Sequence, residues 1–87
     1  MKIDKIEEFK IKNLVELLAL ETQLKQKYSE KADRIEYIIS LLQSKLSTLH
    51  LHSLSDYLFT LYLASQEFNE FKELIPSRDE IMELLEE

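Results

Sequence analysis

The chain has 87 residues, of which 45 % are hydrophobic and 32 % charged, and its formal net charge is −6. This length suits one domain, residues 1–87, with enough apolar material for a core, and the composition argues against wholesale disorder. No glycine, no cysteine and one proline disfavour tight hairpins and nucleotide-binding loops, and exclude disulfides, a thiol nucleophile and thiolate metal sites.

The first predicted helix covers roughly residues 3–27. Its apolar residues lie on one broad face: Ile3, Ile6, Phe9, Leu14, Leu17, Leu18, Leu24 and Tyr28. The face slips between Lys10 and Asn13, because Ile11 falls outside it. Such a slip indicates either a kink or a short leading helix joined to a longer one.

The second and third predicted helices, roughly residues 30–51 and 54–74, have the strongest helical periodicity. Two seven-residue series mark them: Ile35, Leu42 and Leu49 in the second helix, and Leu54, Leu61, Phe68 and Ile75 in the third. We expect these helices to pack as an antiparallel pair. The candidate caps are Ser29 for the second helix, and Ser53 or Ser55 for the third.

The clearest helix boundary in the sequence is Pro76, because proline disfavours helix for the residue before it. Ser77 and Glu80 then form a capping box that starts a last short helix, roughly residues 78–86. Too short to stand alone, this helix must dock on its own chain or on another. The predicted fold is therefore all-α, a small up-and-down helical bundle of three main helices plus a short C-terminal helix. An open helical hairpin that dimerises is the alternative.

Two features of the sequence bear on location. The amino-terminal residues alternate charge with apolar side chains and lack the apolar run of a secretory signal. The most apolar window, residues 57–64, is far shorter than the roughly 20 residues that span a membrane. We therefore expect a cytoplasmic protein with no membrane segment and no membrane partner.

Candidate catalytic and metal-binding residues are sparse. His50 and His52 are the only histidines, and on a helix two residues apart they would point about 200° from each other. Paired carboxylates such as Glu7 and Glu8 also diverge, and no H-E-x-x-H, G-x-S-x-G or P-loop motif occurs. We expect no enzyme activity, no catalytic or metal site and no cofactor.

Charge is unevenly distributed, with a net charge of +1 over residues 1–34 and −7 over residues 35–87. The acidic half should repel phosphates, so direct nucleic-acid binding is not expected of it. The candidate acidic face consists of Glu67, Glu70, Glu73, Glu80 and Glu83. The basic residues form two amino-terminal clusters: Lys2, Lys5, Lys10 and Lys12, and then Lys25, Lys27, Lys31 and Arg34.

Residues 57–64 are apolar around nearly the whole circumference of the predicted helix. Such a helix is either covered on all sides or leaves apolar side chains exposed. In the second case Phe59, Tyr62 and Leu63 form a patch typical of protein interfaces. Phe68 and Phe71 could enlarge this patch, although Phe68 fits the core series better.

These patterns favour a non-enzymatic protein–protein interaction module. The first interpretation is a small accessory subunit or adaptor that binds a larger protein, for instance a nucleic-acid-processing one, through Phe59, Tyr62 and Leu63. The second is an acidic inhibitor or immunity-type protein, whose glutamate face blocks a basic surface of its target. A nucleic-acid binder that uses the amino-terminal lysines is a third possibility. A homo-oligomer, with a second copy over the aromatic surface, also fits the pattern.

Overall fold

The structure, a computed structural model, describes residues 4–86. Four α-helices and three short 3₁₀ segments make up its fold. The α-helices are α1 (Lys5–Lys27), α2 (Ala32–Ser47), α3 (Leu54–Glu67) and α4 (Arg78–Leu85). The 3₁₀ segments are η1 (Ser29–Lys31), η2 (Leu51–Ser53) and η3 (Asn69–Leu74). Residues 4–86 form no strand, which confirms the predicted all-α bundle of three main helices and a short last one. Ile3, at the predicted start of the first helix, lies outside the described residues.

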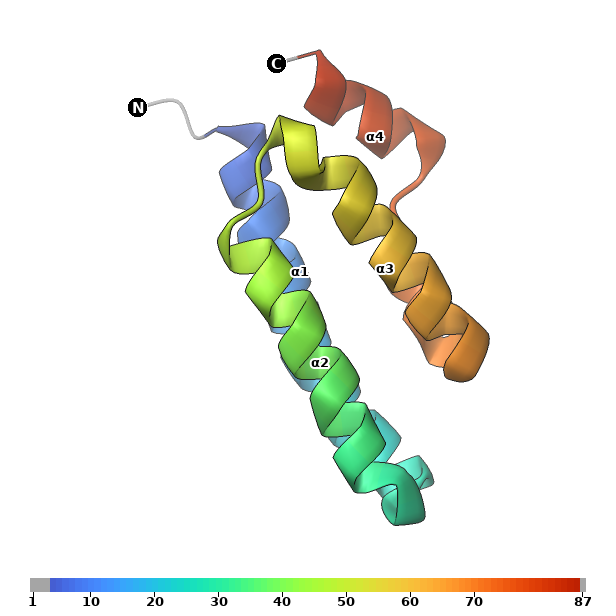
Figure 1. Cartoon of the computed structure of the whole chain (residues 1–87). Coiled ribbons are helices and arrows are strands. Elements are labelled where there is room, and N and C mark those ends of the chain that lie inside the picture. The colour runs from blue at the N-terminus through green and yellow to red at the C-terminus, as the bar shows by residue number, and fades with distance from the viewer. Residues whose placement is uncertain (1–3, 87) are drawn as a thin grey trace.

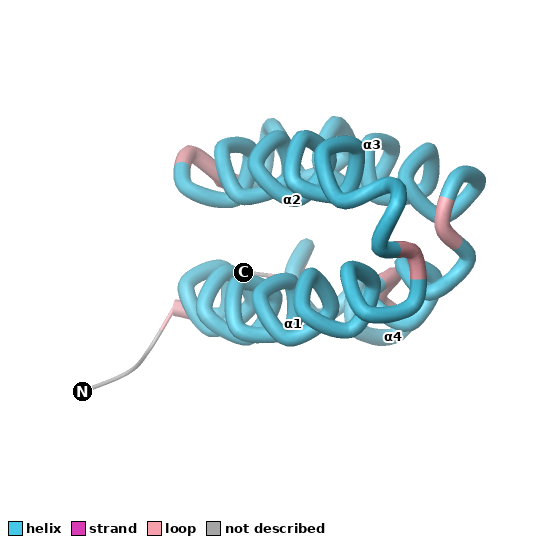
Figure 2. The backbone as a smooth tube through the Cα atoms, turned by 90° about the horizontal axis from the view of Figure 1, so that it is seen from below, coloured by secondary structure: helices cyan, strands magenta, loops and turns pink. Residues whose placement is uncertain are grey.

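The helices lie in two layers (Figures 1 and 2). The helices α2 and α3 lie side by side in one layer, and α1 and α4 lie in the other. A single hydrophobic core fills the space between the layers. Its fully buried side chains include Leu17, Leu24, Ile35, Ile39, Leu42, Tyr57, Leu61 and Phe71. None of the helices built from residues 4–86 is long and apolar enough to cross a membrane.

The first helix, α1, is continuous, so the slip in its apolar pattern marks no break. Asp4 begins the helix, because its Oδ1 accepts the backbone N–H of Ile6 at 3.0 Å. The buried residues keep a regular spacing of three and four: Ile6, Phe9, Asn13, Leu17, Leu20 and Leu24. The slip arises because Asn13 takes one core position, whereas Leu14 and Leu18 are exposed and not on the buried face as predicted.

Two hydrogen bonds satisfy Asn13 inside the core. Its Nδ2 donates to the carbonyl oxygen of Phe9 at 2.9 Å, and its Oδ1 accepts from the Tyr57 hydroxyl at 3.3 Å. The Tyr57 ring also packs edge-on against Phe9, with the ring centroids 6.0 Å apart. Burial, and to a lesser extent the charge of Glu16, raises the pKa of the Tyr57 hydroxyl, which therefore remains protonated as a donor. The hydrogen bond between Tyr57 and Asn13 therefore fixes how α1 and α3 are aligned along their lengths.

The second helix is shorter at both ends than the predicted 30–51. The segment η1 forms its entry, and no side chain caps α2, so Ser29 does not have the expected role. The helix ends at Ser47. Leu49 is nevertheless buried, because the turn after α2 carries it into the core. The seven-residue spacing therefore continues beyond the helix that it was expected to mark.

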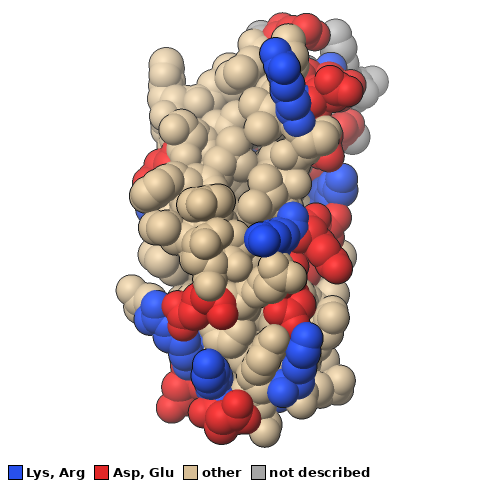
Figure 3. Space-filling model, turned by 90° about the vertical axis from the view of Figure 1, so that its right-hand side faces the viewer, with Lys and Arg blue, Asp and Glu red and all other residues tan. Residues whose placement is uncertain are grey.

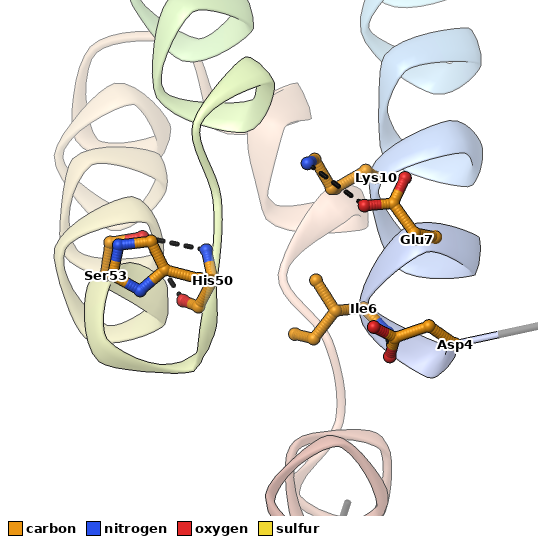
Figure 4. Close-up of polar contacts among 6 residues, drawn as sticks. All are labelled: Asp4, Ile6, Glu7, Lys10, His50 and Ser53. Carbon is orange, nitrogen blue, oxygen red and sulfur yellow. Dashed lines mark hydrogen bonds and ion pairs between the residues drawn. The ribbon is translucent and has the colours of Figure 1, made fainter.

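The turn between α2 and α3 has its own cap, at η2 (Figure 4). The Ser53 Oγ accepts the backbone N–H of His50 at 3.1 Å, and the His50 Nδ1 accepts that of His52 at 3.2 Å. Neither serine proposed as a cap bonds the start of α3, since no side chain caps that helix. The two histidines therefore belong to a hydrogen-bonded turn.

The third predicted helix, 54–74, is broken at Phe68, whose backbone is extended (φ −130°, ψ 106°). Arg34, in the first turn of α2, pairs with Glu67 at the end of α3. A longer α3 would therefore run past the start of α2 and leave its last two turns with nothing to pack against. Because the helix ends at this point, the chain turns back and η3 packs along α1, where Phe71 is buried.

The last helix docks on its own chain. Ser77 Oγ accepts the backbone N–H of Glu80 at 3.2 Å, which confirms the predicted start of α4. Leu84 is buried in the common core, and α4 contacts α1. The Lys12 Nζ lies 3.7 Å from a carboxylate oxygen of Glu80 across this contact.

Removing the Tyr57 hydroxyl should destabilise the fold, because the buried Oδ1 of Asn13 would lose its donor. We expect Tyr57→Phe to lower the free energy of unfolding by about 1–2 kcal/mol, the usual cost of a buried polar atom left unpaired. Urea denaturation followed by circular dichroism measures this difference.

The double variant Asn13→Leu with Tyr57→Phe is the control, because it leaves neither polar group unpaired and should recover the lost stability. Tyr37→Phe, on an exposed ring, should change the free energy of unfolding by less than about 0.5 kcal/mol. A Tyr57→Phe protein as stable as the wild type would contradict the role given to this bond.

Candidate functional site

The helix α3 presents an uncharged apolar surface on the side away from the core. Between Asp56 and Glu67 it carries no charged residue. Phe59, Tyr62 and Leu63, which we call the α3 patch, are between 51 % and 59 % exposed. Their spacing of three and four places them on the same side of the helix. In Figure 3, which faces the α3 side, uncharged atoms cover most of the upper left, and charged groups gather at the lower end and over the right-hand half.

The α3 patch is exposed because the opposite side of the helix supplies the core. The buried residues of α3 are Leu54, Tyr57, Leu61, Ala64 and Ser65. Leu58 is partly buried between them and the patch. Of the two interpretations of residues 57–64, the structure shows the one with exposed aromatic side chains. Phe68 and Phe71 are buried and add nothing to this surface.

The five glutamates of the expected acidic face do not form one open surface. Glu67 accepts two hydrogen bonds from the Arg34 guanidinium, at 2.7 and 2.8 Å. Glu70 accepts one from the Lys27 ammonium at 2.7 Å and one from the Tyr28 hydroxyl at 3.2 Å. Both carboxylates therefore hold the second half of the chain against the first.

The remaining glutamates are divided between paired and unpaired groups. Glu80 lies opposite Lys12, whereas Glu73 and Glu83 form no ion pair with any residue of the described range 4–86. Five residues of the basic clusters also form ion pairs within the chain: Lys10, Lys12, Lys25, Lys27 and Arg34. Lys2, in the first cluster, lies outside the described residues.

These ion pairs lower the proton affinity of two carboxylates. The hydrogen bond from Lys27 is the main cause that holds the pKa of Glu70 below its ordinary value, and the bond from Arg34 does the same for Glu67. Partial desolvation opposes both shifts. Because the folded-state pKa is the lower one, the pairs stabilise the fold above the ordinary glutamate pKa of 4.5 and lose this effect below it.

The two histidines lie together at the turn before α3, with ring centroids 5.7 Å apart. The Nδ1 of His50 is already occupied by the backbone N–H of His52. Within residues 4–86, no three histidine or carboxylate side chains come together in an arrangement that could hold a metal ion.

Sequence reasoning missed a second exposed apolar surface, on α1. It consists of Ile11, Leu14, Val15 and Leu18, which are between 42 % and 62 % exposed. We call it the α1 stripe. A shallow, mostly apolar groove runs beside it, between α1 and α2, lined by Lys10, Ile11, Leu14, Gln43, Leu46 and Ser47. The position of Ile11 off the first apolar face was the signal of this stripe.

No protein-family model matches the chain, and searches of curated proteins and of solved structures also find no match. The described residues 4–86 carry two exposed apolar surfaces, on α1 and on α3. The α3 patch is the more aromatic of the two surfaces, and the α1 stripe is purely aliphatic.

The ion pair of Glu70 should make stability depend on pH. We expect Glu70→Gln to be less stable than the wild type at pH 7, and the difference to shrink as the pH falls below the ordinary glutamate pKa of 4.5. The reason is that the wild-type carboxylate becomes protonated and loses its attraction to Lys27. Urea denaturation of both proteins across this pH range measures the difference.

Glu73→Gln is the matched control, because Glu73 makes no ion pair among the described residues, and its effect on stability should be small. A deficit of Glu70→Gln that stays constant from neutral to acidic pH would show that the pair with Lys27 does not stabilise the fold.

Proposed function

We propose that the protein is a non-enzymatic interaction module, an accessory subunit or adaptor that binds a larger protein through the α3 patch. One observation carries the proposal: three large apolar side chains lie exposed together on an uncharged stretch of α3. Contiguous exposed apolar surface commonly marks a protein interface. Tyrosine and phenylalanine also bury much area for little loss of side-chain entropy.

The form of the patch favours a helix-in-groove contact. Phe59, Tyr62 and Leu63 have the spacing with which one helix face inserts its anchors into an apolar groove. The Tyr62 hydroxyl can keep a hydrogen bond at the rim of such a groove. Asp56 and Glu67, which flank the uncharged stretch, pair with Lys45 and Arg34 of the same chain, so burial of apolar area is the main contribution to such a contact.

The α3 patch is also held ready for binding. On the other side of the helix, Tyr57 and Leu61 are fully buried, and Tyr57 is hydrogen-bonded to Asn13. At the ends of the helix, Lys45 pairs with Asp56 at 2.6 Å and Arg34 pairs with the last residue of α3. The helix therefore needs no ordering on association, which reduces the entropic cost of binding.

The acidic-inhibitor alternative has less support from the geometry. Glu67, Glu70 and Glu80 pair with bases of the same chain, so a basic target surface would have to compete with those contacts. The nucleic-acid alternative meets the same obstacle, because the paired lysines and Arg34 are neutralised by these carboxylates.

The test uses Tyr62→Asp, which places a charge within the patch. The wild type and the variant serve as baits in the lysate of the source organism, and a protein retained by the wild type is purified for titration. We expect the variant to raise the Kd at least about 30-fold, the loss of roughly 2 kcal/mol that is typical of an anchor residue.

Tyr37→Asp is the matched control, because Tyr37 is similarly exposed but lies on α2. Its ring lies 5.3 Å from the Arg34 guanidinium, and the Kd should change little. Circular dichroism should show unchanged helicity in both variants. An equal Kd for Tyr62→Asp and the wild type, or a partner released by high salt alone, would contradict binding through the α3 patch.

A further inference from the structure

The last helix, α4, is the α-helix with the least attachment to the core. Of its eight residues only Leu84 is buried. By comparison, α1 buries six residues, and α2 and α3 bury five each. The free energy needed to open a segment grows with the apolar area that the segment buries against the rest of the fold. The helix α4 therefore has the least burial to lose when it separates.

The contact between α4 and α1 is also only partly filled. A hollow of about 200 Å³ lies between the two helices, lined by Phe9 and Lys12 of α1 and by Glu83 and Leu84 of α4. We call the part of α1 that carries Phe9 and Lys12 the α4 seat. Side chains that border a hollow lose the dispersion contacts that close packing would give them. Leu84 therefore holds α4 less firmly than a fully packed leucine would.

The other connections of α4 are weak or yielding. The Lys12 Nζ lies 3.7 Å from a carboxylate oxygen of Glu80, and the two side chains are 60 % and 46 % exposed, so this ion pair contributes little. The link from η3 is extended at Ile75 (φ −71°, ψ 119°) and Ser77 (φ −69°, ψ 164°), with Pro76 between them. No helix continues through this link, so α4 can move without distorting its neighbour.

The rest of the bundle is held together by contacts that do not include α4. The hydrogen bond between Asn13 and Tyr57 joins α1 to α3, and the ion pair of Lys27 with Glu70 joins α1 to η3. Further ion pairs join α2 to α3 near both ends of α3. These contacts, and the core that α1, α2, α3 and η3 share, remain when α4 leaves.

Once detached, α4 would not stay helical. Its eight residues are fewer than the roughly 12–15 that an isolated helix needs to be even marginally stable in water. Detachment therefore also unwinds the segment and returns its backbone entropy, which favours the open state. Opening of α4 should thus require much less free energy than unfolding of the whole chain.

We propose that α4 is a strap that opens as a unit about Pro76 while α1, α2, α3 and η3 stay folded (Figure 1). Opening uncovers the α4 seat, because Phe9, which is 5 % exposed in the closed state, loses the neighbouring Leu84 and Lys12 loses Glu80. The strap thereby controls access to an aromatic side chain beside a base, at one end of α1. The proposal does not depend on what the α3 patch binds.

Amide hydrogen exchange of the wild type, followed by NMR, tests the opening. The amides of residues 81–86 should have similar protection factors, at least about 100-fold below those in the middle of α2 and α3. Low concentrations of urea should change their exchange little, because a local opening exposes little surface. Protection equal to that of α2 and α3 would overturn the proposal, and so would a gradient that falls only toward the end of the chain, the pattern of simple fraying.

Two neighbouring leucines provide a matched pair of variants, because Leu84 is buried and Leu85 is 59 % exposed. Leu84→Ala should speed exchange of the α4 amides at least about tenfold and leave the protection of α2 and α3 within about twofold. Leu85→Ala makes the same change of residue type and should leave the protection of α4 nearly unchanged. Equal acceleration by both variants, or a loss of protection in all helices of Leu84→Ala, would contradict a strap held by Leu84.

The strap and the α3 patch are tested separately. Leu84→Ala should bind the partner of the α3 patch with the Kd of the wild type, and Tyr62→Asp should show the same protection of residues 81–86 as the wild type. A change in the protection of these amides in Tyr62→Asp would show that α4 opens together with α3, and would overturn its independence.

Discussion

In a two-layer bundle of this size, each helix can bury only the side that faces the other layer. The helices α1 and α3 carry more apolar residues than that side accommodates, so each leaves a set exposed. The exposed set is mostly aromatic on α3 and aliphatic on α1. Both surfaces follow from the same limit on burial, and they lie on helices that the core already holds rigid.

The uneven charge of the chain has a structural use. Basic residues of the first half meet acidic residues of the second at several points, among them Lys27 with Glu70 and Arg34 with Glu67. Together with the buried hydrogen bond between Asn13 and Tyr57, these contacts fix which parts of α1 and α2 lie beside α3, and which part of α1 lies beside η3. The apolar core alone would tolerate more than one alignment of such helices, whereas paired polar groups discriminate among them.

Much of the fold follows from periodicity and capping residues, and the rest depends on tertiary contacts. The start of α4 was predictable because Pro76 and Ser77 act locally. The end of α3 was not, since the apolar repeat continues through Phe68 and the break reflects where α2 begins. The exposed residues of the α3 patch appeared in the sequence as one of two alternatives. The α1 stripe was hidden because Asn13 occupies a core position, which shifts the apparent apolar face by one residue.

The reversals of this chain are built without glycine, and no described residue has a positive φ. They pass instead through extended residues such as His50, Phe68 and Ile75. A residue with a Cβ has fewer backbone conformations in the denatured ensemble than glycine, a difference of about 0.4–1 kcal/mol per position where the native geometry permits either. Part of the stability of this bundle therefore resides in the restricted freedom of its unfolded chain, outside any contact of the native state.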